Sequence, residues 1–266
     1  MIKVAVSGAS GRMGQMILNA VAKADDIELG AALDRADSPL IGKDAGEVTG
    51  KATGVIVSAD PACIEGCDVL IDYTRPEATL SYLPVCAEKG VAAMIGTTGF
   101  DEAGKKAISA TAEAVPVILA ANTSVGVNAV LSLVAEAARL LAGTDVEIVE
   151  MHHRNKIDAP SGTALEMGRA VAKARGQNFD DVAILSREGR TGARPDNAIG
   201  FAALRGGDVV GVHTVIFAGT GERVEISHHS TSREGYAQGA LTAARYLAKQ
   251  EKGLYSMNDV LGISKK

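Results

Sequence analysis

The first half of the chain alternates short apolar runs with segments whose apolar residues recur at helical spacing. The runs cover residues 2–6, 27–33, 68–73, 91–95 and 115–120, and each leads within two residues into Gly, Ser, Thr, Asn or Asp. Short apolar runs separated by helical segments are typical of buried parallel strands joined by helices. This half therefore predicts an α/β domain with helices on both faces of its sheet.

The pattern changes in the second half. A long apolar segment at 127–141 predicts a helix, and 145–151 predicts a strand. Three more strands are expected at 200–204, 208–218 and 223–229, because Gly-rich turns separate them. They favour an α+β domain with a mostly antiparallel sheet. A last helix at 234–249 is expected to return to the first domain and cover its sheet.

A glycine-rich loop follows the first strand directly. Residues 8–14 read Gly-Ala-Ser-Gly-Arg-Met-Gly, and apolar positions at helical spacing come next. In dinucleotide-binding folds such glycines allow a tight turn (here Gly8), close approach of the backbone to phosphate (Gly11) and close packing of helix on strand (Gly14). The spacing is a variant of the usual one, but it predicts a Rossmann-like nucleotide site.

The end of the second strand strengthens this prediction. Asp34 lies 20 positions after Gly14, about where an acidic residue meets the adenosine ribose, and Arg35 follows it. A carboxylate there favours NAD, whereas a guanidinium can hold the extra phosphate of NADP. The pair predicts weak discrimination between the two cofactors. The alternative is that both residues merely begin a solvated loop.

Other strands of the first half also end in small polar residues. The relevant loops are Gly96-Thr97-Thr98-Gly99 and Ala121-Asn122-Thr123-Ser124. Because ligands of parallel sheets bind outside the carboxyl ends of the strands, these loops are expected to line one crevice. After residue 73, the residues Thr74 to Glu77 predict a helix start with a T-x-x-E capping box.

Composition excludes several classes of function. The 266 residues are 47% hydrophobic and 22% charged, with a net charge of −5 and only 3% aromatic residues. Without a basic run or a stacking surface, nucleic acid is not an expected partner. No apolar run is long enough to span a bilayer, so no membrane contact is expected. Three cysteines and an N-terminus without signal-peptide features predict a cytoplasmic protein.

Residues 150–164 hold the strongest chemical signal. They read Glu-Met-His-His-Arg-Asn-Lys-Ile-Asp-Ala-Pro-Ser-Gly-Thr-Ala, so His152, His153 and Lys156 lie just before a helix start. Ser161 or Thr163 is expected to cap that helix. Proton donors beside a helix N-terminus suit an enzyme that protonates a small anionic substrate. Adjacent histidines on a strand point to opposite faces, so no metal site is expected.

The loop at 8–14, Gly96–Gly99, the segment Asn122–Asn128 and residues 150–164 together resemble one family. It is dihydrodipicolinate reductase, which acts in diaminopimelate and lysine biosynthesis, and the resemblance covers nearly the whole chain. It implies reduction of 4-hydroxy-tetrahydrodipicolinate, a cyclic imine with two carboxylates, by NADH or NADPH. It also implies a homotetramer assembled through the antiparallel sheet.

The resemblance also implies roles for particular residues. His152 and Lys156 are the expected catalytic residues, and which of them delivers the proton stays open. The expected dinucleotide-binding residues come from four loops: Gly8, Ala9, Ser10, Gly11, Arg12, Met13, Asp34, Arg35, Gly96, Thr97, Thr98, Ala120, Ala121, Asn122 and Thr123. The expected substrate-binding residues are His153, Ser161, Gly162 and Thr163. Many members of the family have Phe at the position of Thr123.

We therefore expect residues 1–123 and 234–266 to form the dinucleotide-binding domain, and residues 124–233 to bind the substrate and assemble the oligomer. Two other functions remain compatible with the nucleotide loop. One is another two-domain amino-acid dehydrogenase, such as an aspartate or homoserine dehydrogenase. The other is an NAD(P)H-sensing protein without catalysis, which would not need the proton donors at 152–156.

Overall fold

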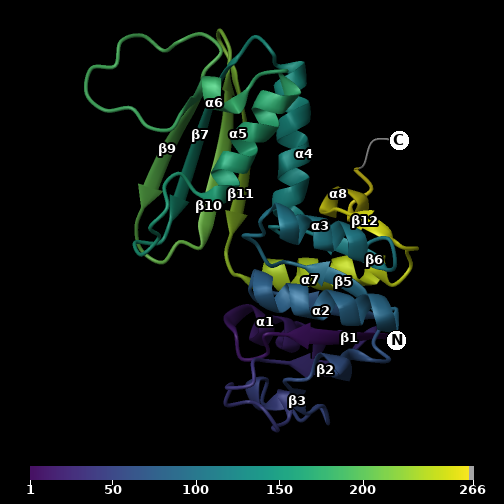
Figure 1. The fold of residues 1–266 in the computed structure, drawn as a ribbon. Coiled ribbons are helices and arrows are strands. Elements are labelled where there is room, and N and C mark those ends of the chain that lie inside the picture. Colours follow the sequence, from purple (N-terminus) through teal and green to yellow (C-terminus); the bar gives the residue numbers. More distant parts are fainter. Residues whose placement is uncertain (264–266) are drawn as a thin grey trace. The chain divides into compact units, whose positions relative to one another are not determined.

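The computed structural model describes residues 1–263 and divides the chain into two compact units. Unit 1 consists of residues 1–125 together with the segment from Glu234 onward, and unit 2 of Gly126–Arg233. Unit 2 is therefore inserted into unit 1. Figure 1 shows the purple β1 and the yellow α7 in the same unit, although they lie far apart in the sequence.

Unit 1 contains a seven-stranded sheet in which every pairing is parallel. In chain order the strands are β1 (Ile2–Ser7), β2 (Ile27–Leu33), β3 (Val57–Ser58), β4 (Val69–Asp72), β5 (Ala92–Ile95), β6 (Pro116–Leu119) and β12 (Gly253–Tyr255). Their spatial order is β12-β6-β5-β4-β1-β2-β3. Apart from β12, this is the 3-2-1-4-5-6 order of dinucleotide-binding folds, in which the order of the strands reverses beside β1.

Helices cover both faces of this sheet. They are α1 (Arg12–Val21), α2 (Pro76–Lys89), α3 (Glu102–Thr111), α7 (Glu234–Leu247) and the short α8 (Met257–Val260), with 3-10 turns η1 (Ala45–Val48) and η2 (Pro61–Ile64). Val4 and Val6 of β1 belong to the core under α1 and α7, whereas Ala5 belongs to the core under α2 and α3. Successive residues of a strand thus fill two apolar cores, which explains the continuous apolar runs.

The prediction of a capping box at the start of α2 is wrong. The helix begins at Pro76, and its N-cap is Arg75, which is extended and makes no side-chain cap. A residue before proline is disfavoured in the helical region, so the helix begins one residue after the position that the motif indicates. The hydroxyl of Thr74 instead donates to Asp72 Oδ1 at 2.7 Å.

Unit 2 contains a five-stranded sheet in the order β11-β10-β7-β9-β8. Its strands are β7 (Asp145–His152), β8 (Ala183–Ile184), β9 (Ile199–Arg205), β10 (Gly211–Ala218) and β11 (Arg223–Ser230). The pairings of β10 with β7 and β11 are antiparallel, but β7–β9 and β8–β9 are parallel. The sheet is therefore mixed and not mostly antiparallel, because a helical crossover leads from β7 to β8 and β9.

The helices of unit 2 are α4 (Val125–Leu140), whose first residue still belongs to unit 1, α5 (Gly162–Ala174) and α6 (Phe179–Val182). Val134 and Ala138 of α4 join residues of α5 in one apolar core with Val146 and Ile148 of β7. We call the sheet face toward these helices the inner face and the opposite one the outer face. Along β7 the inner residues are Val146, Ile148, Glu150 and His152. The inner face thus changes from apolar to ionisable along one strand.

None of the helices formed by residues 1–263 combines the length and apolar character that crossing a bilayer requires. Within the same described residues, no group of three or more His, Cys, Asp and Glu side chains is arranged to hold a metal ion.

Candidate active site

The carboxylate of Glu150 organises the polar end of the inner face in unit 2. It is 1% exposed and accepts two parallel hydrogen bonds of 2.8 Å from the guanidinium of Arg205 at the end of β9. It also accepts from His152 Nδ1 at 2.6 Å and from the Ser161 backbone N–H at 3.1 Å. Burial raises the pKa of Glu150, but the bonds from Arg205 and His152 outweigh it and hold the net pKa below its usual value.

Glu150 determines how the His152 ring is protonated. Its carboxylate can only accept, so His152 carries a hydrogen on Nδ1 and Nε2 is left to exchange protons. Burial lowers the pKa of His152 below its usual value, although the bond to Glu150 opposes this shift. A Cβ atom on Gly211 of β10 would lie 3.0 Å from His152 Nε2, so a glycine there leaves room for the ring.

Ser161 links this network to the N-terminus of α5. It is the N-cap of the helix, and its Oγ accepts from the Ala164 N–H at 3.3 Å. The same Oγ lies 2.9 Å from Nε2 of His213, a buried residue of β10. Of the two residues expected as the cap, Ser161 is therefore the one used. Gly162 and Thr163 form the first turn of α5, the former exposed and the latter half-buried.

Lys156 lies in the loop between β7 and α5. Its Nζ is 2.8 Å from Asp158 Oδ1, and its side chain is 20% exposed. The backbone carbonyl of half-buried His153, just beyond the end of β7, accepts from the Lys156 N–H at 3.1 Å. Arg205 also donates to the Asp158 carbonyl at 2.7 Å, so one guanidinium binds both the buried carboxylate and this loop. The loop thus holds an ammonium close to water and close to the His152 network.

In unit 1, the loop after β1 has the shape of a phosphate-binding turn. Gly8 has φ +69°, a conformation that favours glycine, and its carbonyl accepts from the Gly11 N–H at 2.8 Å. A Cβ atom on Gly14 would lie 2.0 Å from the Gly8 carbonyl oxygen. The N-cap of α1 is Gly11, so no side chain occupies that helix N-terminus. Ala9 is buried, Ser10 and Met13 are half-buried, and Arg12 is exposed.

Asp34 lies at the carboxyl end of β2, next to this loop. It is 7% exposed, and its Oδ2 accepts from the Ser10 N–H at 2.7 Å and from the Ser38 hydroxyl at 2.9 Å. Burial raises its pKa, but the hydrogen bonds from Ser10, Arg35 and Ser38 outweigh it, so the net pKa is lowered. Arg35 is exposed and pairs with Asp37 at 3.0 Å. The carboxylate is fixed, whereas the guanidinium faces solvent.

The loops after β5 and β6 meet at the same edge of this sheet. Thr97 is buried and donates to Asp72 Oδ2 at 3.0 Å, while Thr98 is exposed. A Cβ atom on Gly96 would lie 2.3 Å from the ring of Tyr73, so only glycine fits there. Thr123 is buried, hydrogen-bonds the Tyr73 hydroxyl, and donates to the Tyr236 carbonyl at 2.9 Å. Ala120 is buried, Ala121 exposed and Asn122 half-buried.

Comparison with known proteins identifies the family. Two family models match, "Dihydrodipicolinate reductase, N-terminus" at residues 2–123 and "Dihydrodipicolinate reductase, C-terminus" at residues 126–261. The chain is 54% identical over 264 residues to the 4-hydroxy-tetrahydrodipicolinate reductase of Herminiimonas arsenicoxydans, covering 98% of each chain. The chain belongs to the dihydrodipicolinate reductase family. The resemblance inferred from the sequence is thus confirmed.

Further relatives agree with this family. The 4-hydroxy-tetrahydrodipicolinate reductase of Cupriavidus pinatubonensis is 53% identical, over 98% of this chain and 100% of its own length. Among solved structures, the dipicolinate-bound dihydrodipicolinate reductase from Paenisporosarcina sp. TG-14 superposes with a TM-score of 0.79 at 27% identity, covering 96% of this chain and 97% of its own.

Sequence reasoning missed three residues in this member of the dihydrodipicolinate reductase family. Glu150, Arg205 and His213 complete the network around His152 and Ser161, yet none was assigned a role. A signal for Glu150 was present in the sequence. Side chains alternate between the two faces of a strand, so Glu150 lies on the same face of β7 as the apolar Val146 and Ile148, which places a carboxylate on the buried face. Arg205 stood at a Gly-rich turn, which disguised its position at a strand end.

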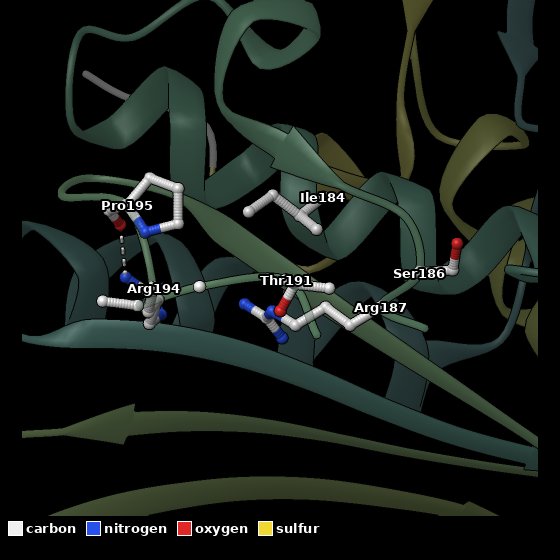
Figure 2. Close-up of a pocket in the computed structure, with 8 residues that line it drawn as sticks. Ile184, Ser186, Arg187, Thr191, Arg194 and Pro195 are labelled. Atoms are coloured by element: carbon white, nitrogen blue, oxygen red, sulfur yellow. Dashed lines mark hydrogen bonds between the residues drawn. The ribbon is translucent and has the colours of Figure 1, made fainter. Parts of the chain in front are cut away.

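A separate pocket of about 270 Å³ lies in unit 2 of this reductase-family chain, at the loop between β8 and β9. Figure 2 shows Arg187 and Arg194 in its lining, together with Ile184 and Pro195. Both guanidiniums bind Glu147, at 2.8 and 3.0 Å, and Glu147 lies on the outer face of β7. The pocket contains none of the predicted catalytic residues, and its two cations are already neutralised in part.

Proposed function

We propose that this chain catalyses the NAD(P)H-dependent reduction of 4-hydroxy-tetrahydrodipicolinate to tetrahydrodipicolinate in diaminopimelate and lysine biosynthesis. The observation behind this function is the identity with reductases of that name over nearly the whole chain. The network around His152 supports it, because it combines an ionisable ring, an ammonium and a helix N-terminus. These are the groups that protonation of an anionic substrate needs.

Unit 1 is proposed to bind the dinucleotide, and the residues fit such a group. A side chain at position 14 would collide with the Gly8 carbonyl, and the N-terminus of α1 presents backbone N–H groups without a competing side chain. The turn at 8–13 would hold the pyrophosphate, and Asp34 the ribose. Residues 96–98 and 120–123 follow β5 and β6 at the same sheet edge and would complete the site. The bound nicotinamide supplies a hydride.

Unit 2 is proposed to bind the dicarboxylate substrate. The N-terminus of α5 offers the backbone of Gly162 and Thr163 and the Ser161 hydroxyl to a carboxylate, and a helix N-terminus favours negative charge. Lys156 and His153 lie on the loop that leads into this helix and would contact the second carboxylate or the ring. A dipicolinate-bound structure among the relatives agrees with a site for a planar dicarboxylate.

The protein's part in the chemistry is to supply a proton. Hydride transfer to a ring carbon that is conjugated with the imine leaves an enamine-like anion. A positioned acid must then protonate this anion. Two groups can do this: His152, through Nε2 with Glu150 stabilising the imidazolium, and Lys156, through Nζ near the surface. Asp158 lies 2.8 Å from the ammonium and so holds it in place in the loop before α5.

The outer face of the second sheet supports assembly into a homotetramer. Along β7 and β10 its residues include Val149, Met151, Val212 and Ile216, all half-buried, and Leu204 of β9 is 50% exposed. An apolar sheet face left open to water is typical of a subunit interface. Sedimentation velocity tests this, because a monomer at micromolar concentration would contradict it. We also propose a cytoplasmic location, which three cysteines without a disulfide among the described residues support.

The function is tested by oxidation of NADH and of NADPH, measured in parallel with substrate formed in place from pyruvate and aspartate semialdehyde by the preceding synthase. We expect synthase-dependent oxidation of both cofactors, because Asp34 suits NADH and the exposed Arg35 suits NADPH. Arg35→Ala should reduce the rate with NADPH and spare that with NADH. Absence of oxidation with both cofactors, by protein that binds them, would refute the proposed function.

A further inference from the structure

His213 occupies an unusual position for a histidine that sequence reasoning left without a role. It is 4% exposed on the inner face of β10, directly opposite Glu150 of β7 in the strand register. Its ring lies edge-on to that of His152, with the ring centroids 5.0 Å apart. Its Nε2 is 2.9 Å from Ser161 Oγ, and its Nδ1 is buried without a hydrogen-bond partner.

The hydrogen bonds of Ser161 limit what His213 can do. A serine hydroxyl has one hydrogen to donate and two lone pairs that accept. One lone pair of Ser161 already accepts from the Ala164 N–H at the start of α5. If His213 donates its Nε2–H to the second lone pair, both are filled, and the serine hydrogen must point away from the protein network.

The other arrangement is less favourable. If Ser161 donates to His213, the ring must carry its hydrogen on Nδ1, where no acceptor lies within the described residues. Buried N–H groups without an acceptor are rare in folded proteins. The serine hydrogen would then also be unavailable to an anion at the N-terminus of α5. Burial, with added repulsion from His152, lowers the pKa of His213 to about 4, so the ring is neutral at pH 7 and one tautomer must be chosen.

We propose that His213 is a positioning residue that donates its Nε2–H to Ser161 and thereby directs the serine hydroxyl hydrogen toward a substrate carboxylate at the N-terminus of α5. This rests on the proposed function, in which Ser161 contacts the substrate. In this role His213 acts on the substrate only through Ser161, to which its ring is hydrogen-bonded. The role is a hydrogen-bond relay from β10 through the N-cap of α5.

The kinetic test replaces His213 by leucine and by glutamine. His213→Leu removes the donor and should raise KM for the dicarboxylate substrate, and Ki for pyridine-2,6-dicarboxylate, about tenfold, as expected for one hydrogen bond to a charged ligand. The value of kcat should stay within about twofold, because the lost contact serves binding in the ground state and the transition state alike. His213→Gln keeps an N–H near the Nε2 position and should restore KM to within about threefold of the wild type.

Two further variants isolate the relay. In a Ser161→Ala background, His213→Leu should have no additional effect on KM, since the hydroxyl that it orients is already absent. The matched control is His228→Leu, because His228 lies opposite His213 on the neighbouring strand and on the same sheet face, also with a buried unpaired Nδ1. This control should leave KM unchanged. An equal rise of KM in both single leucine variants would overturn the relay.

The tautomer is measured without any substitution. Nitrogen-15 NMR of histidine-labelled protein saturated with pyridine-2,6-dicarboxylate should show the His213 ring hydrogen on Nε2. A hydrogen on Nδ1 in that complex overturns the inference, even where His213→Leu does not fold. The outcomes separate the two proposals: wild-type protein without reductase activity refutes the proposed function, whereas active wild type with an unchanged KM in His213→Leu refutes only the relay.

Discussion

Replacing Glu150 by glutamine tests whether one buried carboxylate organises the site. The carboxylate accepts four hydrogen bonds, two from Arg205 and one each from His152 and the Ser161 N–H. A glutamine of the same shape keeps one oxygen, and its NH2 group faces two donors. His152 can become an acceptor by moving its hydrogen from Nδ1 to Nε2. The NH2 group then still faces one donor, the guanidinium of Arg205, and an unpaired buried donor costs about 1–3 kcal/mol.

We therefore expect Glu150→Gln to reduce the free energy of opening of unit 2 by about 2 kcal/mol, which is about 30-fold in the opening equilibrium. Hydrogen exchange measured by mass spectrometry should be faster by about that factor in β7 and β10. Amides of β4 and β5 in unit 1 should be unchanged and serve as the internal reference. Nitrogen-15 NMR should also show His152 protonated on Nε2 instead of Nδ1.

The matched control is Glu225→Gln on β11. Glu225 is a strand carboxylate paired with one arginine, but its side chain is 43% exposed, and exposed pairs contribute little to stability. This control should leave exchange in β7 and β10 within about twofold of the wild type. Unchanged exchange in Glu150→Gln, or a His152 ring that keeps its hydrogen on Nδ1, would refute the role given to Glu150.

Three further predictions concern the other parts of the molecule. Lys156→Ala should lower kcat at least about 100-fold, as expected for loss of a general acid, while calorimetry shows unchanged cofactor binding; near-normal turnover would eliminate Lys156 as a proton donor. Gly14→Ala should weaken cofactor binding at least about tenfold, because its Cβ would meet the Gly8 carbonyl at 2.0 Å; an unchanged Kd would contradict the proposed cradle. His213 has its pKa lowered from 6.5 to about 4, so the unfolded chain binds more protons between these values. Stability should be complete above about pH 6.5 and fall by up to about 3 kcal/mol as the pH drops to 4. Urea titrations monitored by hydrogen exchange in β10 should show this slope in wild type and a shallower slope in His213→Gln, where His152, whose pKa is also lowered, still titrates.

The alternation of apolar runs and helical segments was sufficient to predict the parallel sheet of unit 1, because its strands are buried on both faces and read as continuous apolar runs. The second sheet was predicted less well. The parallel pairing of β7 with β9 depends on the crossover through α5, and β8 is only two residues long, so no periodicity reveals either. The start of α2 was also predicted one residue too early. The T-x-x-E motif favours a helix start at residue 75, but the residue before Pro76 is disfavoured in the helical region.

The candidate site residues that lie close together in the sequence could be proposed from the sequence alone. His152, Lys156 and Ser161 fall within ten positions, and all three side chains can donate a hydrogen bond. Their partners could not be found in this way: Arg205 and His213 lie more than 50 positions after Glu150, and only the strand register brings them to it. A buried ionic network is a property of pairing between strands, and the sequence of one strand does not specify its neighbour.

The insertion of unit 2 has a consequence for synthesis on the ribosome. Residues 126–233 are contiguous and contain a complete core, so unit 2 can fold as soon as they emerge. Unit 1 cannot, because one face of its sheet is covered by Ala240, Leu241 and Leu247 of α7, which are translated after all of unit 2. The strands of unit 1 that are translated first therefore keep that face exposed to water until α7 is made. Chaperones that bind apolar nascent chains should recognise this segment for most of the time of translation.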